Sequence, residues 1–169
     1  MPDLLLESFA RNGRVNAALL SALTDADLDL SDGRGGWPVR QHLAHLANFR
    51  RDWLSNISPA HAEGLPNVYE QTESGYTVKA RDPVSLTAAL QQGDEAAVKA
   101  VQDAVNEGLQ FADPWNEGAY QSHPSHFLQH TIVHDSHHRG QIMALLRMNG
   151  RSQEQMDALE EATWPIWRE

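Results

Sequence analysis

Apolar residues along most of this chain recur at intervals of three and four, the period of a helix that buries one face. These intervals predict four long helices and a short fifth one, over residues 3–22, 38–57, 83–110, 122–150 and 153–162. The sequence lacks clear alternating runs with the period of a half-buried strand. The fold class indicated is therefore all-α, an antiparallel four-helix bundle with a short extra C-terminal helix. We expect one domain over residues 1–169.

Local signals set the expected ends of these helices. Pro38 and Pro83 suit the first turn of a helix, and Ser122 with Pro124 indicates the start of the fourth. Asn149 and the glycine after it supply a left-handed stop. Gly93 indicates a break or kink in the third helix. Residues 58–82 form the longest stretch without a helical pattern, and a connection of that length is usually functional or mobile.

The fourth helix carries the most distinctive chemistry of the chain. Six of the nine histidines lie in residues 122–150. His134 and His138 stand one turn apart on the seam expected to face inward, with Cβ atoms about 5–6 Å apart, so both rings can reach one metal ion. The alternative is a pair of ordinary core histidines that are hydrogen-bonded to neighbours. A metal would also need at least one more ligand from elsewhere in the chain.

The second helix offers two candidates for that third ligand. His42 falls inside the apolar arc of the helix, whereas His45 falls at its polar edge, beside Gln41, Asn48 and Asp52. Periodicity alone favours His42 slightly and leaves the choice open.

Composition narrows the possible partners. The net charge of −10 opposes nucleic-acid binding as a main role, and the longest apolar runs are too short to cross a membrane. The N-terminus does not resemble a secretion signal, so we expect a cytoplasmic protein. The absence of cysteine leaves histidine and carboxylate as metal ligands. Arginines near the histidine-bearing segments indicate either solvated helix faces or a positive rim for an anionic small molecule: Arg34, Arg40, Arg50, Arg51, Arg139, Arg147 and Arg151.

Two motifs resemble those of a known family. GWPVRQHLAHLANF is similar to the second-helix signature of the DinB/YfiT-like bundles, and HTIVHDSHHRGQIMALLRMNG is similar to their last-helix signature. The resemblance implies a divalent metal site with His45, His134 and His138 as ligands, which selects His45 over His42. Asn48 stands where the family often has Asp, so a carboxylate role at that position is not implied.

The resemblance also implies a chemistry. Family members with assigned activities are transferases and isomerases that use a low-molecular-weight thiol activated by the metal, and homodimers are common among them. Three imidazoles leave a position open on zinc or nickel. We therefore expect a metal-dependent transferase that acts on a small-molecule substrate through a low-molecular-weight thiol or a metal-bound water. Arg139 and Gln141 are expected to contact the bound ligand. The alternative is a non-catalytic metal-binding or stress-related interaction protein.

Overall fold

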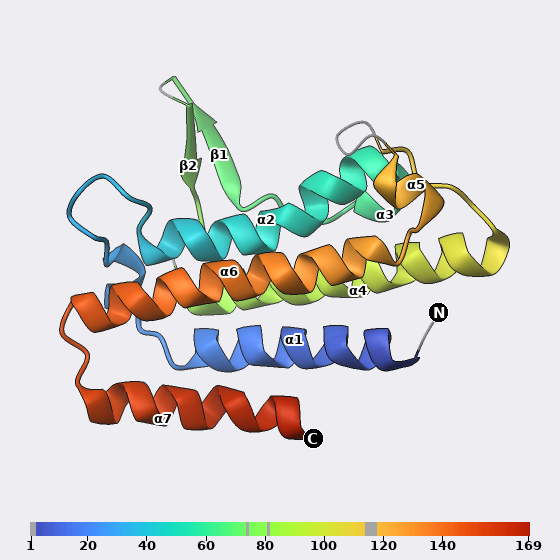
Figure 1. Cartoon of the computed structure of the whole chain (residues 1–169). Coiled ribbons are helices and arrows are strands. Elements are labelled where there is room, and N and C mark those ends of the chain that lie inside the picture. Colours follow the sequence, from blue (N-terminus) through green and yellow to red (C-terminus); the bar gives the residue numbers. More distant parts are fainter. Residues whose placement is uncertain (1–2, 74, 81, 114–117) are drawn as a thin grey trace.

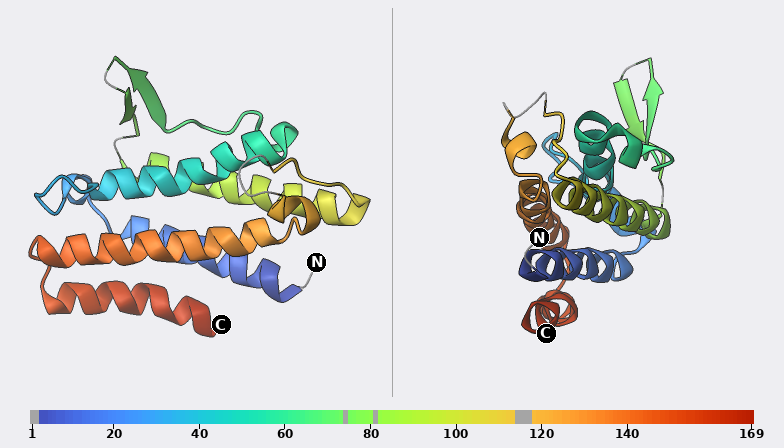
Figure 2. Two further views of the ribbon diagram at one scale, coloured as in Figure 1. Left: turned by 45° about the horizontal axis from the view of Figure 1, so that its top comes forward. Right: turned by 90° about the vertical axis from the view of Figure 1, so that its right-hand side faces the viewer.

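Four long helices form the predicted bundle (Figure 1). The computed structural model describes residues 3–73, 75–80, 82–113 and 118–169. The bundle helices are α1 (Asp3–Ser21), α2 (Val39–Ile57), α4 (Pro83–Glu107) and α6 (His126–Met148). The predicted extra helix, α7 (Gln153–Thr163), lies along α1 on the outside of the bundle (Figure 2). In the described part of the chain, no helix combines the length and the apolar character that a membrane span requires.

The long helices run in two directions. α1 and α6 run one way, and α2 and α4 run the other way (Figure 1). As a result, α2 and α6, the two helices that carry most of the histidines, are antiparallel neighbours. The remaining helical elements are short: η1 (Asp25–Asp29), α3 (Pro59–Ala62), α5 (Ala119–Ser122) and η2 (Trp164–Arg168).

The long connection between α2 and α4 contains a β-hairpin that the sequence analysis did not predict. Strand β1 (Tyr69–Thr72) pairs with β2 (Gly75–Val78) in antiparallel register, with Tyr69 opposite Val78. Each strand has only four residues, and exposed residues follow one another along it, so no alternation is present to recognise. The hairpin projects from the bundle beside α2 (Figure 1). Val68, at its base, is buried in the core.

The predicted helix ends are partly correct. α6 begins at His126 instead of residue 122, because the segment around Pro124 connects it to the separate short helix α5. The left-handed stop is confirmed at Gly150, which has a φ of 97°. α7 begins with a capping box formed by Ser152 and Gln155.

The predicted break at Gly93 is wrong, because α4 continues as one helix through this position. A Cβ atom built on Gly93 would lie 2.9 Å from the Cβ of Arg50 on α2. The close approach of two helices favours glycine here.

The bundle interior consists of two apolar clusters separated by a polar layer. One cluster contains Leu19 of α1, Leu43 of α2 and Ile142 of α6, and the other contains Phe9 and Phe127. Each of the four helices contributes residues to both clusters. Near the junction of the two clusters, each helix contributes at least one polar side chain, buried except for the partly exposed Asp94; the five residues are Asn12, Asn16, Arg50, Asp94 and Asp135.

Substitution of Gly93 tests the close packing of α2 on α4. We expect Gly93→Ala to destabilise the fold by about 1–3 kcal/mol, because the new methyl group meets the stem of a buried arginine. Helix propensity alone would predict the opposite sign. The matched control is Gly140→Ala in α6, where the added Cβ meets nothing within 4 Å and should stabilise the protein by about 0.5–1 kcal/mol. Urea denaturation of both variants measures the difference.

Candidate metal centre

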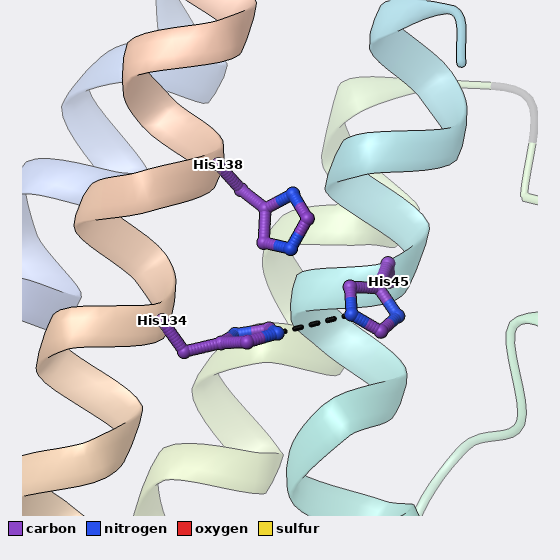
Figure 3. A group of neighbouring side chains, drawn as sticks. All are labelled: His45, His134 and His138. Carbon is purple, nitrogen blue, oxygen red and sulfur yellow. Dashed lines mark hydrogen bonds between the residues drawn. The ribbon is translucent and has the colours of Figure 1, made fainter. Parts of the chain in front are cut away.

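Three histidine rings from two helices converge near the middle of the bundle (Figure 3). His45 comes from α2, and His134 and His138 come from α6. One ring nitrogen of each lies within 4.8 Å of the other two, and the Nε2 atoms of His45 and His134 are 3.0 Å apart. The one-turn spacing of His134 and His138 on α6 brings their ring centroids to 4.6 Å. The group is therefore compatible with the binding of a metal ion.

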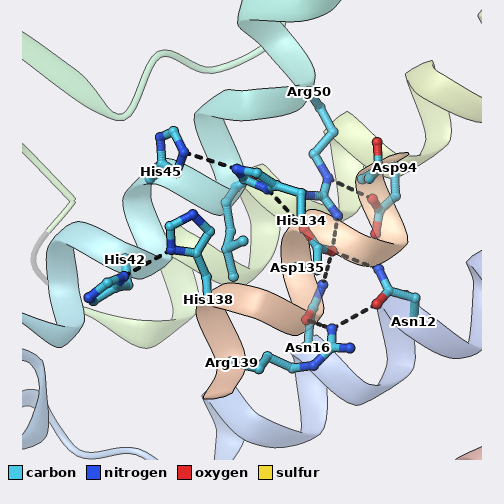
Figure 4. A network of polar contacts seen from close by, with 12 residues as sticks. Asn12, Asn16, His42, His45, Arg50, Asp94, His134, Asp135, His138 and Arg139 are labelled. Carbon is cyan, nitrogen blue, oxygen red and sulfur yellow. Dashed lines mark hydrogen bonds and ion pairs between the residues drawn. The ribbon is translucent and has the colours of Figure 1, made fainter. Parts of the chain in front are cut away.

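His42 lies behind this group. Its Nδ1 is 2.9 Å from the Nδ1 of His138, and its side chain is buried (Figure 4). A hydrogen bond between two such nitrogens requires a proton on one of them. If His138 is the donor, its Nε2 carries a lone pair that is free to bind a metal. Periodicity placed His42 correctly in the apolar interior, but the structure groups His45 with the α6 pair.

Aromatic side chains cover the histidine group. Trp37 stacks parallel to His138 at 6.1 Å and meets the edges of the His42 and His45 rings. Phe49 stacks on His134 with ring centroids 3.9 Å apart. Burial, followed by the charges of neighbouring histidines, lowers the pKa of His45 to about 4 and that of His138 to about 3. Both rings are consequently neutral near pH 7, the state in which imidazole binds metals.

The second nitrogen of His134 points toward a buried carboxylate. His134 Nδ1 is buried without a hydrogen-bond partner, and Asp135 Oδ1 lies 3.7 Å away. Asp135 accepts two hydrogen bonds from Arg50, at 2.5 and 2.7 Å, and further bonds from the amides of Asn12 and Asn16 (Figure 4). If Nε2 of His134 binds a metal, Nδ1 carries the proton and faces this carboxylate.

The roles of Arg50 and Asp135 do not follow from the pattern of the sequence. The sequence led us to expect Arg50 either on a solvated helix face or in a positive rim for an anionic molecule, but its side chain is fully buried. Asp135 is also fully buried, on the inward side of α6. A signal was present in α1, since Asn12 and Asn16 are one turn apart on its apolar face. Polar residues at inward positions of several helices indicate a shared buried network.

The two residues expected to contact a bound ligand lie outside the three-histidine group. The Arg139 Nη1 group donates to the Oδ1 atoms of Asn12 and Asn16, at 2.7 and 2.6 Å, on the side of α6 that faces α1. Gln141 is hydrogen-bonded through Nε2 to the exposed His137 at 2.6 Å. A ligand contact by either residue stays a prediction.

A cavity of about 490 Å³ opens beside His45. Gln41, Asn48 and Asp52 line it along α2, and Tyr69 and Tyr76 line it from the hairpin. The long connection that the sequence analysis associated with function therefore contributes part of the cavity wall. The volume suits a small molecule.

The residues present fit a divalent metal. Imidazole nitrogens bind zinc at about 2.0–2.1 Å, which in tetrahedral geometry separates two of them by about 3.4 Å. The three nitrogens are already within 4.8 Å, so small ring rotations bring them to that spacing. The Nδ1 atom of His134 is buried and has no hydrogen-bond partner among the described residues. This is consistent with metal binding at Nε2, because the ring proton then resides on Nδ1.

Burial of these histidines predicts how the metal-free protein responds to acid. The pKa values of His45 and His138 lie below the ordinary 6.5, so the unfolded chain binds more protons between about pH 6.5 and 4. The free energy of unfolding should therefore fall as the pH is lowered through this range. Chemical denaturation in the presence of a chelator measures it. His138→Gln should reduce the slope, and an unchanged slope would contradict the assigned cause.

Comparison with known protein families agrees with the helical bundle and its three-histidine group. The family model described as "DinB family" matches residues 1–169 of the chain. Searches of curated proteins and of solved structures gave no match. The match over the full sequence, together with the helical bundle and its three-histidine group, shows that this chain belongs to the DinB family.

Proposed function

We propose that this protein is a divalent-metal-dependent transferase that acts on a small molecule through a low-molecular-weight thiol or water. His45, His134 and His138 would hold the metal, with zinc or nickel as the expected ion. The observation that carries the proposal is the convergence of three imidazole nitrogens beside an open cavity. Three protein ligands with a free position are the usual pattern of a catalytic metal and not of a structural one.

The metal would lower the pKa of a coordinated thiol or water and so supply a nucleophile near neutral pH. The chain's own residues prepare the site for this chemistry. Trp37 and Phe49 pack against the histidine rings, and His42 is hydrogen-bonded to the Nδ1 of His138. The chain contains no cysteine, so the reactive sulfur would be brought by a second small molecule.

Metal analysis and mutagenesis test the proposed ligands. We expect about one equivalent of divalent metal in the purified protein, and none in His134→Ala, because two imidazoles alone bind too weakly. His137→Ala is the matched control, since His137 is exposed and adjacent to His138, and its ring nitrogen is hydrogen-bonded to Gln141 outside the three-histidine group. Equal metal contents of the two variants would contradict the ligand assignment.

Turnover distinguishes an enzyme from a metal-binding protein without activity. Consumption of monochlorobimane with a panel of small thiols should require both the metal and His134. Stoichiometric metal without metal-dependent turnover across the panel would favour the non-catalytic alternative. The expected homodimer and the cytoplasmic location stay predictions from the sequence.

The contact between His42 and His138 leads to a separate prediction about metal affinity. Loss of a group that orients a metal-binding histidine typically lowers affinity by about 10–100-fold, so we expect this decrease for His42→Ala. The stoichiometry at saturating metal should stay at one, whereas His45→Ala should abolish binding. Competition titrations with a chromophoric chelator measure both constants. Loss of stoichiometric binding in His42→Ala with retention in His45→Ala would reverse the two roles.

A further inference from the structure

A second cavity, of about 580 Å³, lies on the side of α6 that is turned away from the histidine group. Its wall includes Ser136, which is rotated from His134 by about 200° around the helix axis. Residues of α1, α7 and η2 complete the wall. The cavity is therefore separate from the one beside His45, and its volume suits a small molecule.

The lining of this cavity is largely apolar and open along α6. Ser136, Gly140 and Ala144 follow one another at intervals of one turn and line it together. A Cβ atom built on Gly140 would meet no heavy atom within 4 Å. The η2 segment adds Trp164 and Trp167, whose indole rings offer flat apolar surfaces. The lining thus favours a ligand with a flat apolar body.

Two contacts help to fix the tryptophan-bearing wall on the bundle. Arg11 of α1 donates to the backbone carbonyl of Trp167 at 3.2 Å. Arg14, one turn later in α1, forms an ion pair with Glu169 at 2.6 Å. The η2 segment is consequently attached to α1, and the cavity is present without a ligand.

The same cavity contains a guanidinium group without an ion pair. Arg139 lines it, and its Nη1 donates to the neutral side-chain amides of Asn12 and Asn16 (Figure 4). Asp135 does not pair with this group but is bonded to Arg50 and to the same two asparagines. Among the described residues, the Nε and Nη2 groups of Arg139 have no hydrogen-bond partner. A partly buried cation in this state favours an anionic partner.

The charges that line the cavity favour an anion with one negative charge. Two arginines, Arg139 and Arg147, stand against one acidic residue, Glu160, although the chain as a whole has a net charge of −10. Within the described part of the chain, Arg147 also forms no ion pair. The single excess positive charge suits a monoanion better than a dianionic phosphate.

We propose that this cavity binds a small aromatic monocarboxylate, whose carboxylate pairs with the Nε and Nη2 groups of Arg139 and whose ring lies against Gly140 and the η2 tryptophans. The Nε–Nη2 edge of a guanidinium presents two parallel N–H groups that match the two oxygens of a carboxylate. The site is separate from the proposed metal centre, so the inference goes beyond the proposed transferase function.

Two probes of the same shape test the inference. 2-Naphthoate carries the carboxylate on a flat ring system, and 2-naphthamide is its uncharged isostere. Isothermal titration calorimetry of the whole protein near pH 7.5 gives both affinities. We expect the carboxylate to bind at least about tenfold more tightly than the amide, because only the carboxylate forms charge-assisted bonds with the arginine.

Arginine variants locate the charge that is responsible. Arg139→Gln should reduce the preference for the carboxylate to less than about threefold. Arg34→Gln is the matched control and should keep the wild-type ratio, because it makes the same change of charge at an exposed residue outside the cavity. A preference that is unchanged in Arg139→Gln would overturn the inference.

Two further variants leave the bonds of Arg139 to the asparagines intact and so separate binding from folding. Gly140→Leu places a side chain in the open space and should abolish the binding of both probes. Glu160→Gln removes a like charge from the wall and should strengthen the binding of 2-naphthoate by about threefold, with no change for 2-naphthamide. Unchanged binding of 2-naphthoate in Gly140→Leu would contradict the assigned site.

The remaining outcomes distinguish other occupants of the cavity and other sites for the probe. His45→Ala should bind 2-naphthoate as the wild type does, and loss of binding in this variant would place the carboxylate at the metal centre and overturn the inference. Equal affinities of the wild-type protein for the two probes would also overturn it. So would the binding of neither probe by a wild-type dimer that Gly140→Leu converts to monomers, because a second copy of the chain would then occupy the cavity.

Discussion

The buried ion pair between Arg50 and Asp135 is the interaction on which the rest of the structure depends. Removing two charges from water costs several kcal/mol for each ion, so such a pair is tolerated only when every polar atom is satisfied. Here Arg50 makes two bonds to Asp135, one to Asp94 and one to the carbonyl of Leu46. Burial alone would raise the pKa of Asp135, but the charge and hydrogen bonds of Arg50 outweigh it and lower that pKa. The carboxylate therefore stays ionised inside the bundle.

This pair fixes the register of the helices that carry the histidines. Arg50 lies five residues after His45 on α2, and Asp135 directly follows His134 on α6. A displacement of either helix along its axis would break the ion pair, because neither charge has water as an alternative partner. The polar layer consequently helps to set the level at which the three imidazoles meet. The close approach of α4 at Gly93 holds Arg50 from the other side.

The sequence predicted the elements with strong periodicity and missed those that depend on pairing. Four helices and the His134–His138 pair follow from intervals of three and four. The choice between His42 and His45 could not follow from them, because the apolar arc of α2 indicates burial and not which ring meets α6. His42 is the more buried residue, yet His45 at the polar edge joins the group. Asp135 and Arg50 were missed because a charged residue on a helix is ordinarily solvated, and only the partner on another helix reverses that expectation.

The buried polar atoms without partners show where the fold is not optimised for stability alone. Among the described residues these atoms are Arg40 Nε, Asn48 Oδ1 and His134 Nδ1. The nearby Arg50 network satisfies charges that are far more costly to bury, so the fold is able to provide partners where stability requires them. His134 belongs to the three-histidine group, and Asn48 lines the cavity that opens beside His45. Departures from local satisfaction of polar groups are expected at functional sites. Two of the three atoms therefore belong to residues of the histidine group and its cavity, which supports the proposal that the two form one binding site.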